Sequence, residues 1–200
     1  MYKEDEVVMA VERSVLFKNV AFQGFNENFQ YFEERVLRNK KFMQRKDLEK
    51  NPNYKQPIAV SVIINQSTKK VFSHQRLKGD KRLQKQYSLG IMEHINPKDN
   101  YSSPIDSCII RALEEEVNIH DPQIKKFGVV NDDTQKVSKC HIGFVYIVKT
   151  DLENINLKDP GLANGKFSTL EEIMKLNSNG SKLESWSVYY LPALFKLINS

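Results

Sequence analysis

The sequence predicts an α+β fold in which a mixed β-sheet is sandwiched between α-helices. Apolar segments that read as strands come mostly in pairs joined by short turns, and helical segments separate these pairs without a regular strand–helix alternation. Hydrophobic residues make up 40% of the chain and charged residues 28%, which is a globular balance. A chain of 200 residues can bury one sizeable core. We therefore expect a single domain over residues 1–200, with the N-terminal strands and helix of 1–56 packed on it.

The N-terminal quarter of the chain is predicted to hold two strands and one long helix. The stretches EVVMAV (Glu6–Val11) and SVLFKNVAF (Ser14–Phe22) are rich in β-branched and aromatic residues and read as strands. A single helix is predicted over Asn26–Lys50, because apolar side chains recur there at helical spacing. These side chains are Phe29, Phe32, Val36 and Met43. We expect them to face the core.

Further strands are predicted where short apolar runs lie between turn-forming residues. They cover Pro57–Asn65, Val71–Arg76, Tyr87–Ile91, Ile124–Val130 and Lys139–Val148. Two helices are predicted at the C-terminal end, over Ser168–Leu176 and Leu183–Ile198. Ser168 and Glu171 have the spacing of a capping box at the start of the first of these helices.

The helix predicted in the middle of the chain has clear signals at both ends. Ser103 can cap its N-terminus, Pro104 suits the first helical position, and Asp106 lies in the first turn, where the helix dipole favours a carboxylate. Asn118 follows the last helical residue and tolerates the left-handed conformation that often ends a helix. A buried stripe is predicted along this helix at Ile105, Ile109, Leu113 and Val117.

The same helix carries two adjacent carboxylates near its C-terminal end. Glu115 and Glu116 lie three and four residues after Ala112, so these positions are neighbours on the helix surface, and Arg111 lies one turn away. Adjacent carboxylates repel each other unless a cation lies between them or water screens them. The pattern alone is compatible with a solvated helix face or with a metal site.

This segment resembles the box of the Nudix hydrolase family, which reads G, five residues, E, seven residues, then R-E-U-x-E-E-x-G-U, with U a bulky aliphatic residue. The second half of the box is matched here by Arg111, Leu113, Glu115, Glu116 and Ile119. Asp99 lies six residues after Glu93, as the first box glutamate lies after the glycine. The segments around YSLGIMEHIN, VVNDDTQKVSKCHIGFVYIV and LESWS look like the MutT-type branch of predicted phosphoesterases. The resemblance spans most of the chain and implies the Nudix fold.

The chain departs from the family pattern at several positions. Asn118 stands at the box glycine, and Met92 and Glu93 replace a Gly-Gly pair in the preceding loop. Eleven residues instead of seven separate Asp99 from the box arginine. Ala112 stands where the family has a glutamate that commonly binds metal, and a methyl group cannot replace this function. The box is therefore degenerate.

The resemblance implies hydrolysis of a phosphoanhydride bond in a nucleoside diphosphate derivative with Mg²⁺ or Mn²⁺. It assigns catalysis to Arg111, Glu115 and Glu116, with the two glutamates also as metal ligands. A third carboxylate could come from Glu93, in the loop that the family folds against this helix. His94 and Arg82 are expected to bind substrate. The alternative is a catalytically impaired Nudix-fold module that binds a phosphorylated ligand as a sensor or regulator.

Charge and composition bound the expected partners. The formal net charge is +5, and seven basic residues lie in each of the runs Arg35–Lys50 and Lys69–Lys85, which favours anionic partners, either phosphate esters or nucleic acid. Each run taken alone is explained more simply by solvated lysines on a helix or a loop. No nucleic-acid-binding motif accompanies these runs, so we do not expect a nucleic acid. We also expect no membrane association and a cytoplasmic location, because the start of the chain lacks an apolar segment and Cys108 and Cys140 have no metal-type spacing. A homodimer is left open.

Three further polar residues are interpreted as structural. His141 begins an apolar strand, and a single histidine in such a place is usually a hydrogen-bonded core residue. Asp132 and Asp133 lie between two predicted strands, where turn geometry alone favours aspartate.

Overall fold

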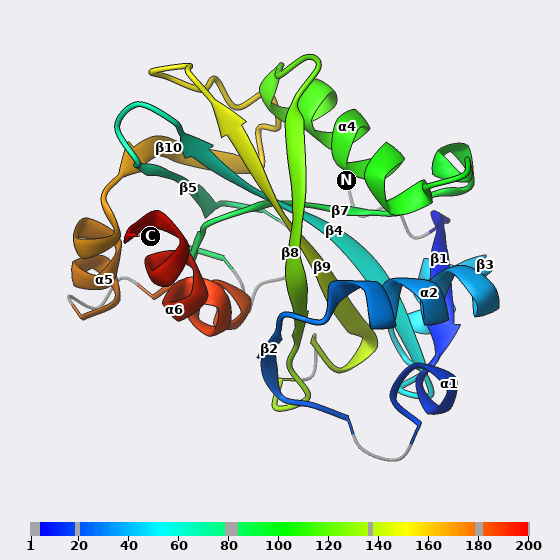
Figure 1. Ribbon diagram of the computed structural model, residues 1–200. Helices are drawn as coiled ribbons and strands as arrows, with labels where there is room; N and C mark the ends of the chain where they lie inside the picture. Colours follow the sequence, from blue (N-terminus) through cyan, green and yellow to red (C-terminus); the bar gives the residue numbers. More distant parts are fainter. Residues whose placement is uncertain (1–4, 19–20, 79–83, 136–137, 179–181, 200) are drawn as a thin grey trace. The chain divides into compact units, whose positions relative to one another are not determined.

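The structure of the chain is a computed structural model, and it describes residues 5–18, 21–78, 84–135, 138–178 and 182–199 (Figure 1). Two compact units share the chain. The first consists of Met1–Val60, Met92–Ile109 and Lys126–Val145, and the second of Ser61–Ile91, Ile110–Lys125 and Tyr146–Ser200. The predicted α+β class, a mixed sheet flanked by helices, is confirmed.

Most strands of the first unit are joined in antiparallel pairs. Its strands are β1 (Val7–Glu12), β2 (Gly24–Asn26), β3 (Lys41–Gln44), β7 (Ile91–His94, from Met92 on) and the parts of β4 (Tyr54–Asn65), β8 (Gln123–Asn131) and β9 (His141–Thr150) that fall in this unit. Strand β1 pairs antiparallel with both β3 and β4, and β2 pairs antiparallel with β8. Strand β7 pairs with β4. The pairing of β1 is therefore what draws the N-terminal segment into the sheet.

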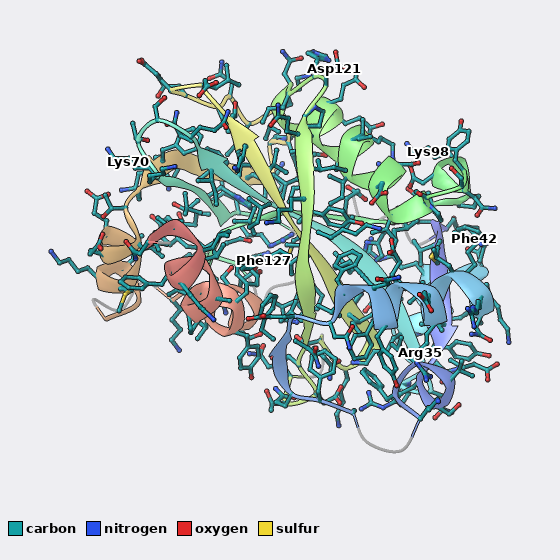
Figure 2. All side chains as sticks on the ribbon, in the orientation of Figure 1. Arg35, Phe42, Lys70, Lys98, Asp121 and Phe127 are labelled. Carbon is teal, nitrogen blue, oxygen red and sulfur yellow. The ribbon has the colours of Figure 1, made fainter. Side chains whose placement is uncertain are left out.

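Among the described residues, the first unit also holds three complete helices, two short 3₁₀ turns and the beginning of a longer helix over Pro104–Val117. The complete helices and the turns are α1 (Arg13–Phe17), α2 (Phe29–Asn39), α3 (Arg45–Leu48), η1 (Pro97–Asp99) and η2 (Ser138–Cys140). The rings of Phe17, Phe22 and Phe32 meet one another with centroids 5.0 to 6.4 Å apart, which joins α1 to α2. Arg35, labelled in Figure 2, donates a hydrogen bond from α2 to the Val15 carbonyl in α1 at 2.7 Å. Aromatic packing and this bond fix the two helices together.

Two predictions for this unit are wrong. The helix predicted over Asn26–Lys50 is broken, because Lys40 adopts an extended conformation and Lys41–Gln44 pairs with β1. Met43 then packs from this strand on the buried β1 and α3 residues Val8, Ala10 and Leu48. The strand predicted over Ser14–Phe22 begins instead as helix α1.

The second unit holds one antiparallel group of strands and two C-terminal helices. The strands are β5 (Val71–Arg76), β6 (Tyr87–Ser88), β10 (Leu162–Ser168) and the remaining parts of β4, β8 and β9. The helices are α5 (Leu170–Ser178), α6 (Ser185–Asn199) and the C-terminal part of α4 (Pro104–Val117). Strand β5 pairs antiparallel with β4, β6 and β10. The sequence did not predict β10. No helix of the described residues is long and apolar enough to cross a membrane.

The capping box of α5 is one residue later than predicted. The Thr169 N–H donates to the Glu172 carboxylate at 2.9 Å, and the Glu172 N–H donates to the Thr169 hydroxyl at 3.2 Å. Ser168 is instead the last residue of β10, where it pairs with Val71. Strand pairing therefore decides between two capping boxes that the sequence allows equally.

Helix α4 (Pro104–Val117) begins and ends where the sequence predicts. The Ser107 N–H donates to the Ser103 carbonyl at 2.9 Å, which makes Ser103 the residue that precedes the first helical turn. The predicted apolar stripe is buried, with 0 to 3% of each side chain's surface exposed at Ile105, Ile109, Leu113 and Val117. These four residues fix which face of α4 is left for polar side chains.

Candidate functional site

The box-like residues of α4 include an ion pair one helical turn apart. The Arg111 Nη1 lies 3.0 Å from the Glu115 Oε2, and the Glu115 side chain is 50% exposed whereas that of Arg111 is 14% exposed. Because residues four apart are adjacent on a helix, this geometry follows from the sequence spacing. Glu116 is partly exposed on the same turn. Two carboxylates and one guanidinium are thus held on the last two turns of α4.

The C-terminal end of α4 is held by several hydrogen bonds. Asn118 has a φ of 55°, so the predicted left-handed residue at the box glycine is confirmed. The Ile119 N–H donates to the Leu113 carbonyl at 3.1 Å. The Lys158 ammonium donates to the Glu114 carbonyl and to the Asn118 Oδ1, both at 3.0 Å. A cation at this end also opposes the negative pole of the helix dipole.

Replacing Asn118 by alanine is expected to lower the free energy of unfolding by about 1–2 kcal/mol. Alanine pays the steric cost of a positive φ, and the hydrogen bond from Lys158 is lost as well. Asn118→Gly is the matched control, because glycine adopts this conformation freely and loses the same hydrogen bond. Urea denaturation of both variants measures the difference. An Asn118→Ala variant as stable as Asn118→Gly would show that the left-handed residue carries no strain.

Ala112 is 1% exposed, so the position at which the family has a glutamate is closed over by neighbouring atoms. A glutamate introduced there would have to reach past these atoms or displace them.

The loop residues predicted to assist α4 belong to the first unit or lie outside the described residues. Glu93 accepts a hydrogen bond from the His94 N–H on its own strand at 2.9 Å. Its role as a third metal ligand beside Glu115 and Glu116 stays a prediction. Arg82 lies outside the residues that the structure describes.

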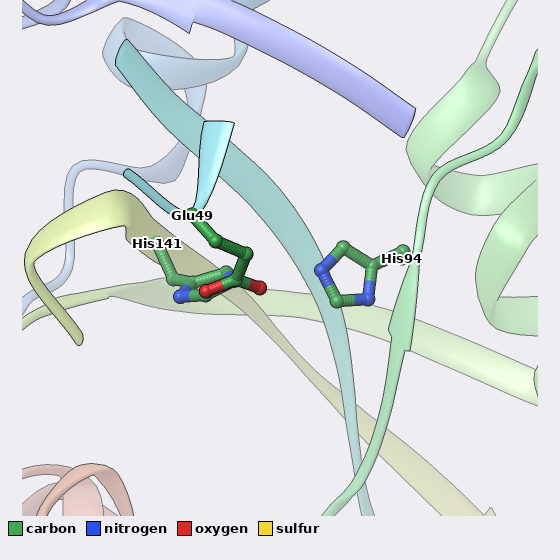
Figure 3. Close-up of side chains that lie close together, drawn as sticks. All are labelled: Glu49, His94 and His141. Atoms are coloured by element: carbon green, nitrogen blue, oxygen red, sulfur yellow. The ribbon is translucent and has the colours of Figure 1, made fainter. Parts of the chain in front are cut away.

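A second group of potential metal ligands lies in the first unit and was not predicted as a site. Glu49 at the end of α3, His94 in β7 and His141 at the start of β9 point toward one another (Figure 3). One ligand atom of each lies within 4.8 Å of the others. Within the described residues, no other set of three or more His, Cys, Asp or Glu side chains meets this criterion. His94, predicted to bind substrate, is thus brought together with a histidine that the sequence suggested was structural.

The contacts inside this group are close and directional. The His141 Nε2 lies 3.6 Å from the Glu49 Oε1, and the His94 and His141 rings meet edge to face with centroids 5.5 Å apart. Burial favours the neutral carboxyl of Glu49, but His141 and Arg45 outweigh this and hold the pKa of Glu49 below its ordinary value. Glu49 is therefore a carboxylate, the form that binds metal ions, at neutral pH.

The backbone that carries these three side chains is fixed by neighbouring groups. The Cys108 thiol donates to the His94 carbonyl at 3.4 Å, and the Cys140 thiol donates to the Glu49 carbonyl at 3.7 Å. Both thiols are buried and neither forms a disulfide. They position the backbone of two of the three residues.

A buried lysine fixes the backbone of the third. The Lys55 ammonium, whose side chain is fully buried, donates to the His141 carbonyl at 3.0 Å and to the Asp133 carboxylate at 2.8 Å. Asp133 also forms an ion pair with Arg13. Burial lowers the pKa of Lys55 to about 8, whereas Arg13 and Lys55 overcome burial and hold the pKa of Asp133 well below its usual range. One carboxylate thus compensates two cations.

The two aspartates interpreted as turn residues have different functions. Asp132 accepts hydrogen bonds from the Thr134 N–H and hydroxyl, which is the turn chemistry that the sequence predicts. Asp133 does more, because it neutralises Arg13 and Lys55 from elements far away in the sequence. No local pattern signals that role.

Comparison with known proteins identifies a relative across nearly the whole chain. Protein YmaB of Bacillus subtilis (strain 168) is 30% identical over 208 residues, which covers 97% of this chain and 100% of YmaB. No family model matches the chain.

Solved structures share its fold. The crystal structure of Tm1382, a candidate Nudix hydrolase, has a TM-score of 0.79 and 24% identity, and the match covers 96% of this chain and 100% of that one. The NUDIX domain of Shewanella oneidensis NrtR, solved with ADP ribose, has a TM-score of 0.57 and 12% identity over 72% of this chain and 88% of that one. The chain therefore belongs to the same family as Protein YmaB, and its fold is the Nudix fold.

Proposed function

We propose that the chain is a Nudix-type hydrolase that cleaves a phosphoanhydride bond in a nucleoside diphosphate derivative with Mg²⁺ or Mn²⁺. The observation that carries the proposal is the end of α4, where Glu115, Glu116 and Arg111 occupy the matching positions of the family box on a helix with the expected left-handed end. The Nudix fold also supports the proposal. A fold alone does not define an activity, but a matching set of side chains on that fold narrows the range of possible activities.

The donor set on α4 fits a hard divalent cation. Mg²⁺ and Mn²⁺ prefer carboxylate oxygens, and Mg²⁺ keeps several waters, so two protein carboxylates are enough to hold one ion. The half-exposed Glu115 and the partly exposed Glu116 supply such oxygens without the cost of a deeply buried charge. When bound, the ion would neutralise phosphate oxygens and lower the pKa of a coordinated water.

The protein groups around the carboxylates have separate roles in this proposal. Arg111 holds Glu115 through the ion pair at 3.0 Å and so restricts where its oxygens lie. Lys158 and Asn118 fix the end of the helix on which Glu115 and Glu116 lie. Positioning of this kind matters because a displacement of about 1 Å can cost roughly 10²-fold in rate.

The proposed partner is a small phosphorylated molecule. The structure of the NrtR domain with ADP ribose gives one example of a nucleoside diphosphate derivative on this fold. The net charge of +5 favours such an anion. We further propose that residues 1–200 act as a single Nudix-like domain in the cytoplasm, with His94 and Arg82 contacting substrate and Glu93 contributing to the metal.

A second function is favoured by one observation. Ala112 is buried and supplies no carboxylate at the position where the family has a glutamate. A Nudix-fold module that has lost hydrolysis could still bind a phosphorylated ligand through the remaining groups and act as a sensor or regulator.

Turnover measurements separate the two functions. We expect the natural chain to release phosphate or a nucleoside monophosphate from at least one member of a panel of nucleoside diphosphate sugars, dinucleoside polyphosphates and nucleoside triphosphates, with Mg²⁺ or Mn²⁺ and not with EDTA. Glu93→Ala should reduce this turnover strongly if Glu93 supplies the missing carboxylate, whereas Ala112→Glu should then change it little.

The variants also define the opposite result. If Glu93 is not a ligand, Ala112→Glu should raise turnover, because a general base contributes roughly 10²–10⁴-fold to the rate. This variant should also be less stable than the natural chain, because position 112 is buried. Turnover absent from the natural chain and from both variants, together with binding of ADP ribose detected by calorimetry, would favour the binding module over the enzyme.

A further inference from the structure

We propose that Glu49, His94 and His141 form a binding site for a transition-metal ion, Zn²⁺ by preference. The site uses none of the α4 residues to which the hydrolytic activity is assigned, and it shares only His94 with the proposed substrate contacts. It rests on the convergence of three ligand residues from the end of α3, from β7 and from β9, which lie far apart in the sequence and all belong to the first unit (Figure 3).

The ligand set selects the kind of ion. Two imidazoles and one carboxylate are the protein ligands of several catalytic zinc sites and of non-haem iron sites, and imidazole nitrogen is a preferred ligand of Zn²⁺. Mg²⁺ instead prefers six oxygen ligands and retains its waters. The ion expected on α4 and the ion expected here are therefore chemically different, and they can be distinguished experimentally.

The observed distances are compatible with binding after small side-chain rotations. In a tetrahedral zinc site with bonds of about 2.0–2.1 Å, the ligand atoms lie roughly 3.3 Å apart. The His141 Nε2 and Glu49 Oε1 are already 3.6 Å apart, and all three ligand atoms lie within 4.8 Å. Three protein ligands leave a fourth position for water or for an exogenous ligand.

The surroundings hold the ligands in place as metal sites require. The carbonyls of Glu49 and His94 accept from the buried thiols of Cys140 and Cys108, and that of His141 accepts from Lys55. Groups that position metal ligands in this way typically change metal affinity by roughly 10–100-fold when they are removed. The site is thus preorganised at the level of its backbone.

The Arg45 guanidinium is the contact that argues against a metal, because it pairs with Glu49 at 3.3 Å and could make the group a purely structural ion-pair network. Arg45 is, however, also paired with Glu6 at 2.9 Å, so one Glu49 oxygen can be released to an ion without leaving the guanidinium uncompensated. A metal titration distinguishes the two arrangements.

The test uses the full chain stripped of metal with a chelator and titrated with Zn²⁺, and separately with Co²⁺, whose visible absorption reports its ligands. We expect one ion per chain, no competition by Mg²⁺, and no thiolate charge-transfer band, because Cys108 and Cys140 are not ligands. Glu49→Gln, His94→Gln and His141→Gln should each weaken Zn²⁺ binding by roughly 100-fold, more than the loss of a supporting group.

Two control variants make the result specific. His120 and Glu114 form an exposed histidine–carboxylate pair at 3.4 Å on the second unit, without a third ligand atom close by among the described residues, so His120→Gln should leave Zn²⁺ binding unchanged. The double variant Glu115→Gln/Glu116→Gln should also retain it, which separates this site from the proposed hydrolytic one. Circular dichroism checks that each ligand variant remains folded.

Three outcomes would overturn the proposal. The first is no stoichiometric Zn²⁺ or Co²⁺ binding by the natural chain, a result that does not depend on any variant folding. The second is ligand variants that bind as tightly as His120→Gln. The third is a thiolate band in the Co²⁺ spectrum, which would assign the ion to a cysteine instead.

Discussion

Turnover of the best substrate by the Glu115→Gln/Glu116→Gln double variant should fall by about 10³-fold or more. Amide oxygens carry no net charge, so the variant loses the anionic ligands that would hold Mg²⁺ or Mn²⁺, and metal stabilisation of developing charge is worth several kcal/mol. Steady-state kinetics on the natural chain and the variant measure the loss. The loss of turnover should appear as a lower kcat, because the ion acts on the reacting phosphate.

Glu114→Gln is the matched control for this experiment. Glu114 lies on the same helix, is 59% exposed and pairs with His120, but it does not match a carboxylate of the family box. Its replacement should change kcat by less than about twofold, as expected for an exposed surface pair. Equal losses in Glu114→Gln and in the double variant would mean that α4 acts through its total charge and not through a metal site.

Asp133→Ala should lower the free energy of unfolding by about 3 kcal/mol at pH 7. The variant leaves the fully buried Lys55 without its 2.8 Å carboxylate partner and leaves Arg13 unpaired. Removing one partner of a buried ion pair is costly because the remaining charge is uncompensated. Denaturant unfolding measures the change, and Asp5→Ala, which breaks an exposed pair with Lys46, should change it by less than about 1 kcal/mol.

The effect of Asp133→Ala should depend on pH in a defined direction. The pKa of Asp133 is held well below its usual range in the folded chain, so its contribution to stability is present above about pH 4, the ordinary pKa of an aspartate, and is lost as the pH falls through the folded-state pKa. The gap between the natural chain and the variant should therefore narrow below about pH 4. A gap that widened in acid would contradict the proposed function of the carboxylate.

Local signals in the sequence were enough to predict α4 almost completely. Its cap, first-turn proline and left-handed Asn118 all lie within the helix or next to it, so no distant partner is needed to place the ends. The predicted helix over 26–50 failed for the opposite reason. Met43 continued the apolar spacing of Phe29 and Phe32, but the backbone of 41–44 takes its hydrogen-bonding partner from β1.

The same contrast separates the two candidate sites. The ion pair of Arg111 and Glu115 follows from a spacing of four residues on a helix. Glu49, His94 and His141 are brought together by strand pairing and by α3, and no spacing in the sequence links them. Glu49 was moreover part of the wrongly predicted helix, so its direction could not have been predicted. A lone histidine gives no sign of a partner that lies 47 residues away in the sequence, as His94 and His141 do.

Strand β3 is an edge strand that lies within the first basic run of the sequence, Arg35–Lys50. Among the described strands β3 pairs with β1 alone, so its other edge keeps unpaired backbone donors and acceptors that could template a strand of another chain. Lys40 and Lys41 begin this edge, and Arg45 and Lys46 follow it. Charged side chains at an edge strand are one of the features by which proteins disfavour pairing with a strand of another chain, and the basic residues at both ends of β3 provide that feature here.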